Sequence, residues 1–271
     1  MPPEQEGVPA SPMTVVHGID TLEPSLGRLF VVVGVFDGLH LGHAYLLDAL
    51  RHQAAARDAR PAVVTFDHHP DEILTGSAPP LLCDPDERLA RLAGAGVAVT
   101  VVQHFDRTLR ETPFDSFVRS IADRVELAGF LMTPDSTFGY ERGGTPTTVA
   151  DLGRGLGYEV AVVPPFALEG RPVSSSEIRR AIAAGDFAAA ERLLGRPYAV
   201  VGRGTRAHRD PVLTFGMPVA LPPPGWYGVR IDDLDEAVDH GPDHVHVDAD
   251  GRVRLQGVWL GGPRWRVTFQ A

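Results

Sequence analysis

A short apolar run that ends in a glycine turn and continues as a helix-like pattern places the strongest constraint on the fold. Residues 31–35 read Val-Val-Val-Gly-Val, which is typical of a strand buried on both faces of a parallel sheet. Asp37-Gly38 breaks the run as a turn, and leucines at helical spacing follow in residues 41–50. Such a corner can present backbone N–H groups and a positive helix end to phosphate. The sequence therefore predicts an α/β fold with a phosphate-binding corner.

Two histidines strengthen this interpretation. His40 and His43 are three residues apart and should share one face of the helix start. Gly34, Gly38 and Gly42 leave the backbone uncovered, so a nucleotide can approach it closely. An isolated pair of histidines at this spacing is more often a surface feature, but here they form one string with the glycines, an aromatic residue and an acid.

The length and charge of the chain limit the class of protein. Its 271 residues suit one large domain or two smaller ones, and the net charge of -10 argues against a nucleic-acid partner. The single cysteine, Cys83, excludes an intramolecular disulfide and fits a reducing compartment. No apolar run reaches about 18 residues, so we expect no membrane partner. Residues 1–13, rich in Pro and Glu, are predicted to be a disordered tail and not a signal peptide. We expect a cytoplasmic protein and leave its oligomeric state open.

Alternating strand and helix patterns predict a doubly wound parallel sheet over residues 14–195. Strands are expected at residues 14–16, 31–35, 61–66, 97–102, 127–132 and 158–163. Helices are expected at residues 41–58, 85–92 after an Asp84 cap, 114–126, 147–156, 178–182 after a serine cap, and 187–194 after an Asp186 cap. Ligands bind such sheets at the carboxyl ends of strands, where Asp37, Asp67 and Asp135 fall. Residues 196–271 carry short strand patterns between Gly and Asp turns, with a weak helical pattern at 233–238, and predict a small all-β module.

The string G-x-F-D-G-x-H-x-G-H at residues 34–43 resembles the ATP-binding signature of the nucleotidylyltransferase superfamily. Its GxFDG form is most similar to the FAD synthetase module of bacterial bifunctional riboflavin kinase/FAD synthetases, which implies a Rossmann-like fold. The resemblance implies that His40 and His43 are catalytic and that the nucleotide is bound by Gly34, Phe36, Asp37, Gly38 and Gly42.

Residues 65–70, Thr-Phe-Asp-His-His-Pro, resemble the TFDPHP segment of that family, with His68 in place of proline. The resemblance implies that Phe66, Asp67 and Pro70 bind the flavin acceptor; the alternative is a strand end with exposed histidines. Asp67 with His68 and His69 would suggest a metal site, but adjacent histidines on an extended chain point in opposite directions. We therefore expect no protein ligands to a metal.

The loop at residues 135–139 resembles the family's G-x-[DN]-F-x-F-G segment. Asp135 and Phe138 match it, and the resemblance places Asp135 at the ribose or acceptor and Phe138 at the flavin. Thr133 stands where the family has glycine, and Ser136 stands where it has phenylalanine. These departures could change which ring system is held.

Residues 174–179, Ser-Ser-Ser-Glu-Ile-Arg, resemble the family's SSTxIR segment. A serine-rich helix start with an arginine within one turn supplies hydroxyls, N–H groups and a positive charge for a triphosphate. The alternative is an ordinary N-cap beside a solvated arginine. The resemblance implies that Ser174 and Ser175 bind the nucleotide and that Arg179 is catalytic.

Residues 194–198, Leu-Gly-Arg-Pro-Tyr, resemble the link into the riboflavin kinase module of the bifunctional proteins. That module carries a G-[FY]-P-T-A-N motif, and residues 216–221 here read Gly-Met-Pro-Val-Ala-Leu. Val219 and Leu221 replace a hydroxyl and an amide that a Mg–ATP site would use. The sequence therefore predicts a degenerate kinase-like module without kinase activity.

The resemblance as a whole implies an FMN adenylyltransferase that uses ATP with Mg²⁺, takes FMN as substrate and forms FAD and pyrophosphate. Two alternatives stay open. One is a paralogue that acts on a different phosphorylated acceptor or uses CTP, and the other is a non-catalytic flavin- or nucleotide-binding regulator.

Overall fold

The computed structural model describes residues 12–207, 210–235, 237–255 and 264–271. Its contacts divide the chain into two compact units, which are described separately. The first unit holds the described residues up to Phe36 together with His43–Ala78 and Leu89–Pro165. The second holds Asp37–Gly42, Pro79–Arg88 and the described residues from Phe166 onward. The domain boundary expected at Gly195 stays a prediction, and the tail expected at residues 1–13 lies outside the described residues except for its last two.

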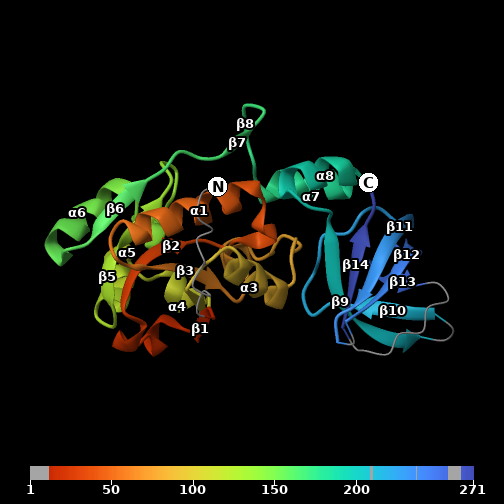
Figure 1. Cartoon of the computed structure of the whole chain (residues 1–271), viewed down its shortest axis with the longest axis horizontal. Helices are drawn as coiled ribbons and strands as arrows, with labels where there is room; N and C mark the ends of the chain where they lie inside the picture. Colours follow the sequence, from red (N-terminus) through yellow and green to blue (C-terminus); the bar gives the residue numbers. More distant parts are fainter. Residues whose placement is uncertain (1–11, 208–209, 236, 256–263) are drawn as a thin grey trace, which may run out of the picture. The chain divides into compact units, whose positions relative to one another are not determined.

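A six-stranded parallel sheet in the order β1-β4-β3-β2-β5-β6 forms the centre of the first unit (Figure 1). Its strands are β1 (Thr14–His17), β2 (Arg28–Val33), β3 (Arg60–Phe66), β4 (Val99–Gln103), β5 (Glu126–Met132) and β6 (Glu159–Val162). Each corresponds to an expected strand, and the predicted doubly wound fold is confirmed. The bounds of β2 differ from the prediction: it begins at Arg28, which pairs with Glu126, and ends at Val33.

The strand order defines where the chain changes direction across the sheet. From β2 the chain moves to β3 and β4 on one side, and then β5 returns to the other side of β2. The crevice at the carboxyl ends of β2 and β5 is therefore the topological switch point, the usual ligand site of an open α/β sheet.

Helices α1 (Leu41–Ala55), α3 (Pro85–Gly94) and α6 (Pro146–Leu156) lie close to their predicted ranges. Helix α5 (Phe114–Ala122) is shorter than predicted, because Asp123 and Arg124 form a turn and Glu126 already belongs to β5. The short helices α2 (Pro70–Leu74) and α4 (Arg107–Arg110) were not predicted.

Both faces of the sheet are covered, as the apolar runs in its strands require. On one face Leu29 and Val31 of β2 share a buried cluster with Phe117 and Ile121 of α5. Phe30, which alternates with them, lies under the guanidinium of Arg57, 4.8 Å from its ring centre, just beyond the end of α1.

In the second unit α7 (Ser175–Ala183) and α8 (Phe187–Leu194) pack with a closed antiparallel barrel, which confirms the predicted all-β module. A hairpin of β7 (Ala167–Leu168) and β8 (Arg171–Pro172) precedes them. The barrel order is β10-β13-β12-β11-β14-β9, with β9 (Ala199–Ala207), β10 (Asp210–Thr214), β11 (Gly225–Asp233), β12 (Val238–Val247), β13 (Val253–Leu255) and β14 (Arg264–Phe269). The helix suggested by the weak pattern at 233–238 is not found among the described residues there: β11 extends to Asp233, β12 begins at Val238, and these two residues pair. Among the described residues, no helix is long and apolar enough to cross a membrane.

Candidate functional site

The corner after β2 has an unusual backbone. Phe36, Gly38 and Leu39 have φ angles of 54°, 76° and 38°, in the left-handed region that residues with side chains rarely adopt. Such positions persist only where the surrounding structure holds them, and they cluster at functional sites. The candidate residues of the corner fall in both units, and each group is described within its own unit.

In the second unit Asp37 is a buried acceptor that ties the turn to two other segments. Asp37 is 3% exposed, and its two carboxylate oxygens accept hydrogen bonds from the Leu82 N–H at 2.9 and 3.1 Å. Arg179 on α7 forms an ion pair with Asp37 at 2.5 Å and donates from Nε to the Pro80 carbonyl at 2.7 Å. Ser175 donates to the Asp37 carbonyl at 3.1 Å. These bonds use two of the three guanidinium nitrogens of Arg179 and make Asp37 a support of the turn.

The serine cap predicted before α7 is confirmed. Ser174 is the N-cap of α7, and its side chain accepts from the Glu177 N–H at 3.3 Å. Ser175 is the first helical residue, so its hydroxyl and the first N–H groups of α7 lie at the positive end of the helix dipole.

His40 belongs to the second unit, where its neighbour Arg196 is a residue that the sequence analysis did not select. The residue is 5% exposed, and burial, together with the nearby charge of Arg196, lowers the pKa of His40 to about 4. Arg196 donates to the carbonyls of Gly38 at 2.6 Å and Leu39 at 3.2 Å. The imidazole of His40 is therefore neutral at pH 7, and the strained turn is held at its carbonyls by a cation. The signal for Arg196 is weak, since its acceptors are backbone atoms, which leave no mark in the sequence.

Gly42 fits closely against His40. A Cβ atom added at Gly42 would lie 3.1 Å from the His40 ring and 3.3 Å from the Val173 carbonyl oxygen. The helix can start beside the buried imidazole because position 42 has no side chain.

In the first unit Phe36 and His43 are in contact. Their ring centres are 5.0 Å apart at 47°, and Phe36 is 2% exposed while His43 is half-buried. A Cβ at Gly34 would lie 3.0 Å from the Phe36 ring, so the glycine leaves room for the aromatic side chain that orients His43.

A pocket of about 220 Å³ lies at the switch point between β2 and β5. It is lined by Val33, Phe130, Leu131, Met132, Ser136, Thr137 and Phe138. Phe138 packs on Phe117 and Phe130, with ring centres 5.4 and 5.9 Å away. The pocket is therefore lined by apolar side chains together with the two hydroxyl residues Ser136 and Thr137.

The two residues that depart from the family loop bond to each other. Thr133 donates from its N–H to the Ser136 hydroxyl at 2.9 Å, and the two hydroxyls are 2.7 Å apart. The Thr133 hydroxyl also donates to the exposed carboxylate of Asp135 at 2.7 Å. The loop thus has a hydrogen-bonded closure of its own in place of a glycine and an aromatic ring.

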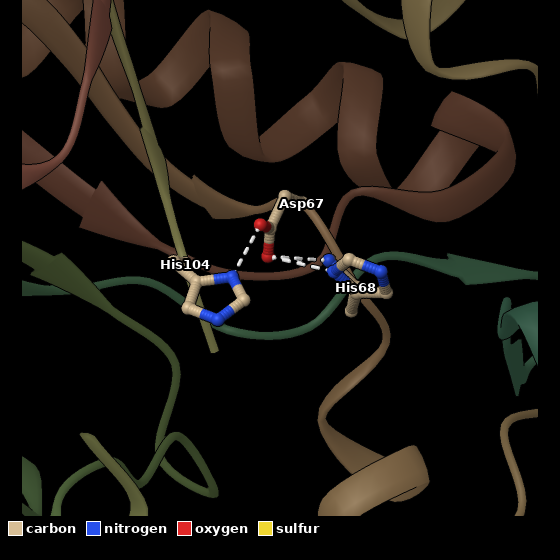
Figure 2. A group of neighbouring side chains, drawn as sticks. All are labelled: Asp67, His68 and His104. Carbon is tan, nitrogen blue, oxygen red and sulfur yellow. Dashed lines mark hydrogen bonds and ion pairs between the residues drawn. The ribbon is translucent and has the colours of Figure 1, made fainter. Parts of the chain in front are cut away.

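Asp67, the residue directly after β3, lies between the side chains of His104 and His68 (Figure 2). It bonds to the His104 ring at 2.6 Å and accepts from the N–H groups of His68 at 2.7 Å and Phe105 at 3.2 Å. Burial raises the pKa of Asp67, but these hydrogen bonds outweigh it and hold the pKa below its ordinary value. The bond to Asp67 and its charge raise the pKa of His104.

His104 is a second residue that the sequence analysis missed, although it lies just after an expected strand. The other members of the 65–70 segment have separate places: Phe66 packs edge-on against Phe105 at 5.3 Å, Pro70 begins α2, and His69 caps that helix by accepting from the Asp71 N–H.

The segment that resembles the kinase motif is held by backbone pairing in the second unit. Leu81 donates to the Pro218 carbonyl at 2.8 Å, and Ala220 donates to the Leu81 carbonyl at 2.9 Å. Val219 and Leu221 pack, partly buried, against the barrel core. A pocket of about 370 Å³ adjoins this segment and is lined in part by Phe215, Gly216, Val219, Arg203 and Arg264.

Comparison with known proteins places this geometry in a family. The family model for FAD synthetase matches residues 23–177, which include the corner, the residue 65–70 segment, the Asp135 loop and the α7 cap. The chain belongs to the FAD synthetase family. It is therefore a nucleotidyltransferase.

Relatives of this FAD synthetase family member carry two activities in their names. A protein from Pseudomonas fluorescens described as bifunctional riboflavin kinase/FMN adenylyltransferase is 33% identical over 192 residues, which cover 70% of this chain and 62% of that protein. The protein of the same description from Escherichia coli strain K12 is 31% identical over 237 residues, 83% of this chain and 75% of that protein.

A solved structure shares the fold of both parts. The crystal structure of a Streptococcus pneumoniae protein described as a macrolide-efflux protein aligns with a TM-score of 0.76 and 22% identity, over 95% of this chain and 89% of that one. At this identity the likeness concerns the fold alone.

Proposed function

We propose that this FAD synthetase family member is an FMN adenylyltransferase, which transfers AMP from ATP to FMN and releases FAD and pyrophosphate. The observation that carries the proposal is the corner at residues 34–43, a G-x-F-D-G-x-H-x-G-H string whose turn is held in a left-handed conformation by Asp37, Arg179 and Arg196. A turn held in this way positions groups for phosphate before any ligand arrives.

In this reaction an FMN phosphate oxygen attacks the α-phosphorus of ATP, and the bond to the β-phosphate oxygen breaks as pyrophosphate leaves. No covalent enzyme intermediate is needed, so catalysis depends on positioning and on stabilising negative charge. We assign His40 and His43 to donate hydrogen bonds to the α-phosphoryl group and the departing pyrophosphate. The neutral ring of His40 offers one N–H for this purpose.

The remaining groups divide between nucleotide and acceptor. We assign Ser174, Ser175 and Arg179 to the β- and γ-phosphates, supported by their place at the start of α7. Asp135 is assigned to the ribose or acceptor. Phe66, Asp67, Pro70 and Phe138 are assigned to the acceptor flavin, for which the switch-point pocket that Phe138 lines offers a surface.

Magnesium is expected to arrive with ATP. Asp37 carries its charge in an ion pair with Arg179 and hydrogen bonds from Leu82, so its carboxylate is a poor candidate for a Mg²⁺ ligand. With Asp37 engaged in this way, Mg²⁺ would be held mainly by phosphate oxygens and water, which is its usual arrangement with nucleotides. When bound, Mg²⁺ would supply positive charge that offsets the negative charge of the phosphates.

We further propose that the chain lacks riboflavin kinase activity. Val219 and Leu221 contribute apolar side chains to the barrel core where the kinase motif would supply a hydroxyl and an amide. The backbone between them is paired with Leu81. The cytoplasmic location of the protein remains a prediction.

A product assay tests both proposals on the purified full chain. With ATP, Mg²⁺ and FMN, separation of the flavins by chromatography is expected to reveal FAD, with one pyrophosphate released per FAD. With riboflavin in place of FMN, no flavin product is expected.

The assay also separates the alternatives. FMN formed from riboflavin would overturn the kinase proposal. No FAD from FMN, with pyrophosphate released on another phosphorylated acceptor or with CTP, would overturn the choice of substrates but keep the enzyme class. No turnover of any pair, together with tight flavin binding, would identify a binding regulator.

A further inference from the structure

Three potential metal ligands converge at one edge of the parallel sheet. Strands β3 and β4 are parallel neighbours, and Phe66 pairs in register with Gln103. Asp67 directly follows β3, and His104 directly follows β4. The Asp67 N–H donates to the Gln103 carbonyl at 3.2 Å. The sheet therefore sets these two side chains opposite each other on rigid strand ends, which is the kind of support that a precise binding site needs.

His68 completes the group from the other side of the carboxylate, as Figure 2 shows. Its Nδ1 lies 3.2 Å from Asp67 Oδ1, while His104 Nδ1 lies 2.6 Å from Asp67 Oδ2. The three ligand atoms are all within 4.8 Å of one another, and the two imidazole rings are nearly perpendicular with centres 5.9 Å apart. Both ring nitrogens thus face one carboxylate.

The carboxylate is also fixed by the backbone. The His68 and Phe105 N–H groups both donate to Asp67 Oδ1, which leaves the group little freedom to rotate. Hydrogen bonds of this kind orient metal-ligating carboxylates in known sites. Asp67 is 33% exposed, and the rings of His68 and His104 are 46% and 63% exposed, so water can complete a coordination shell.

We propose that Asp67, His68 and His104 form a binding site for a divalent transition-metal ion of the zinc class. Two imidazole nitrogens and one carboxylate oxygen suit Zn²⁺, Co²⁺ or Ni²⁺, whereas Mg²⁺ and Ca²⁺ prefer oxygen ligands. In the loaded site each neutral ring carries its proton on Nε2 and offers the Nδ1 lone pair to the ion, so no covalent bond is broken. Around an ion with bonds of about 2.0–2.1 Å the ligand atoms lie about 3.4 Å apart, so the 2.6 Å contact between His104 and Asp67 opens and the wider separations close.

The site differs from the one considered in the sequence. There Asp67 was combined with the adjacent His68 and His69, and in the structure His69 instead caps α2 by accepting from the Asp71 N–H. His104 supplies the second ring from a neighbouring strand. The site is also distinct from the Mg²⁺ that accompanies ATP, because its ligands include nitrogen.

Zinc titration of the full chain without nucleotide tests the proposal. Isothermal titration calorimetry with ZnCl₂ is expected to give one equivalent of bound Zn²⁺, with the affinity at least about 10-fold weaker in His104→Ala and in His68→Ala. Co²⁺ as a probe is expected to give a visible absorption band in the wild-type chain that both substitutions remove.

His52 provides the matched control. It forms an exposed ion pair with Asp48, Nδ1 to Oδ2 at 3.3 Å, and has the same two donor types without the second ring. His52→Ala is expected to leave Zn²⁺ affinity and the Co²⁺ band unchanged. Binding that is absent up to about 100 µM Zn²⁺, or that survives both substitutions in the site, would overturn the proposal. Since the readout is metal binding, its failure leaves the proposed FMN adenylyltransferase activity untouched.

Discussion

At the scale of single residues, the corner combines a buried neutral histidine with a buried ion pair. Asp37 and Arg179 are in contact. The desolvation cost of burying this ion pair is therefore offset by the attraction between the two charges and by the hydrogen bonds with Leu82 and Pro80. For His40, burial and the charge of Arg196 both disfavour the protonated form of the ring. The result is a site whose charges are fixed before a phosphate enters.

The buried His40 predicts a loss of stability in acid. Its folded-state pKa of about 4 lies below the unfolded value of 6.5, so the unfolded chain binds a proton first as pH falls. Its contribution is therefore present above pH 6.5 and is lost between pH 6.5 and 4. Chemical unfolding at pH 7 and pH 4.5 is expected to show that the wild type loses about 2 kcal/mol more than His40→Asn. Equal losses would contradict the burial of a neutral imidazole at this position.

At the scale of elements, the start of α1 is shaped by what lies beside it and less by helix propensity. Alanine generally stabilises a helix relative to glycine by about 0.5–1 kcal/mol. At Gly42 the new Cβ would press on the His40 ring and the Val173 carbonyl. In Gly42→Ala the gain in helix propensity would therefore stabilise the fold, while the displacement of His40 would destabilise it.

Gly42→Ala is expected to lower the rate of FAD formation at least about 10-fold, because a shift of His40 misplaces its N–H from the phosphoryl group. Gly155 on α6 is the matched control, since a Cβ there meets nothing within 4 Å. Gly155→Ala is expected to raise the free energy of unfolding by about 0.5–1 kcal/mol and to leave the rate unchanged. Steady-state rates and denaturant unfolding of both variants make the comparison. Full activity in Gly42→Ala would contradict the role given to the close fit.

Elements also differ in how far their sequence foretells them. The parallel strands are buried on both faces, so β2 and β3 stand out as β-branched runs, and the caps of α3, α7 and α8 are local side-chain patterns. The local pattern is weaker in the barrel, because Gly202, Arg203 and Gly204 interrupt the apolar alternation of β9 and because β10 is short. Both strands form because they pair with neighbouring strands of the barrel. These neighbours are distant in sequence for part of the pairing, so a local sequence pattern does not reveal it.

At the scale of the whole molecule, contacts between distant segments explain what the sequence could not reveal. His104 joins Asp67 because β3 and β4 are neighbours, and Arg196 reaches the turn carbonyls across about 157 positions of chain. The residues of the corner itself were predictable, since the string is contiguous. The supports that hold it come from Leu82, Arg179 and Arg196, each in a different segment of the second unit.

The barrel keeps its fold although its kinase-like motif has changed. Its fold is that of a complete closed sheet, while Val219 and Leu221 have joined its apolar packing. A fold can persist after a site on it is lost, because site residues contribute little to the core. This is why we assign the barrel a fold without the corresponding chemistry.

The most direct test of the account is the single-turnover rate of FAD formation from ATP and FMN in the wild type and in His43→Ala, measured beside ATP affinity. We expect the rate to fall by about 10²–10³-fold, because a donor that acts on developing phosphoryl charge is lost, while ATP affinity changes only a few-fold. A rate within threefold of the wild type, with His43→Ala folded, would contradict the central claim that the corner at residues 34–43 carries out nucleotidyl transfer.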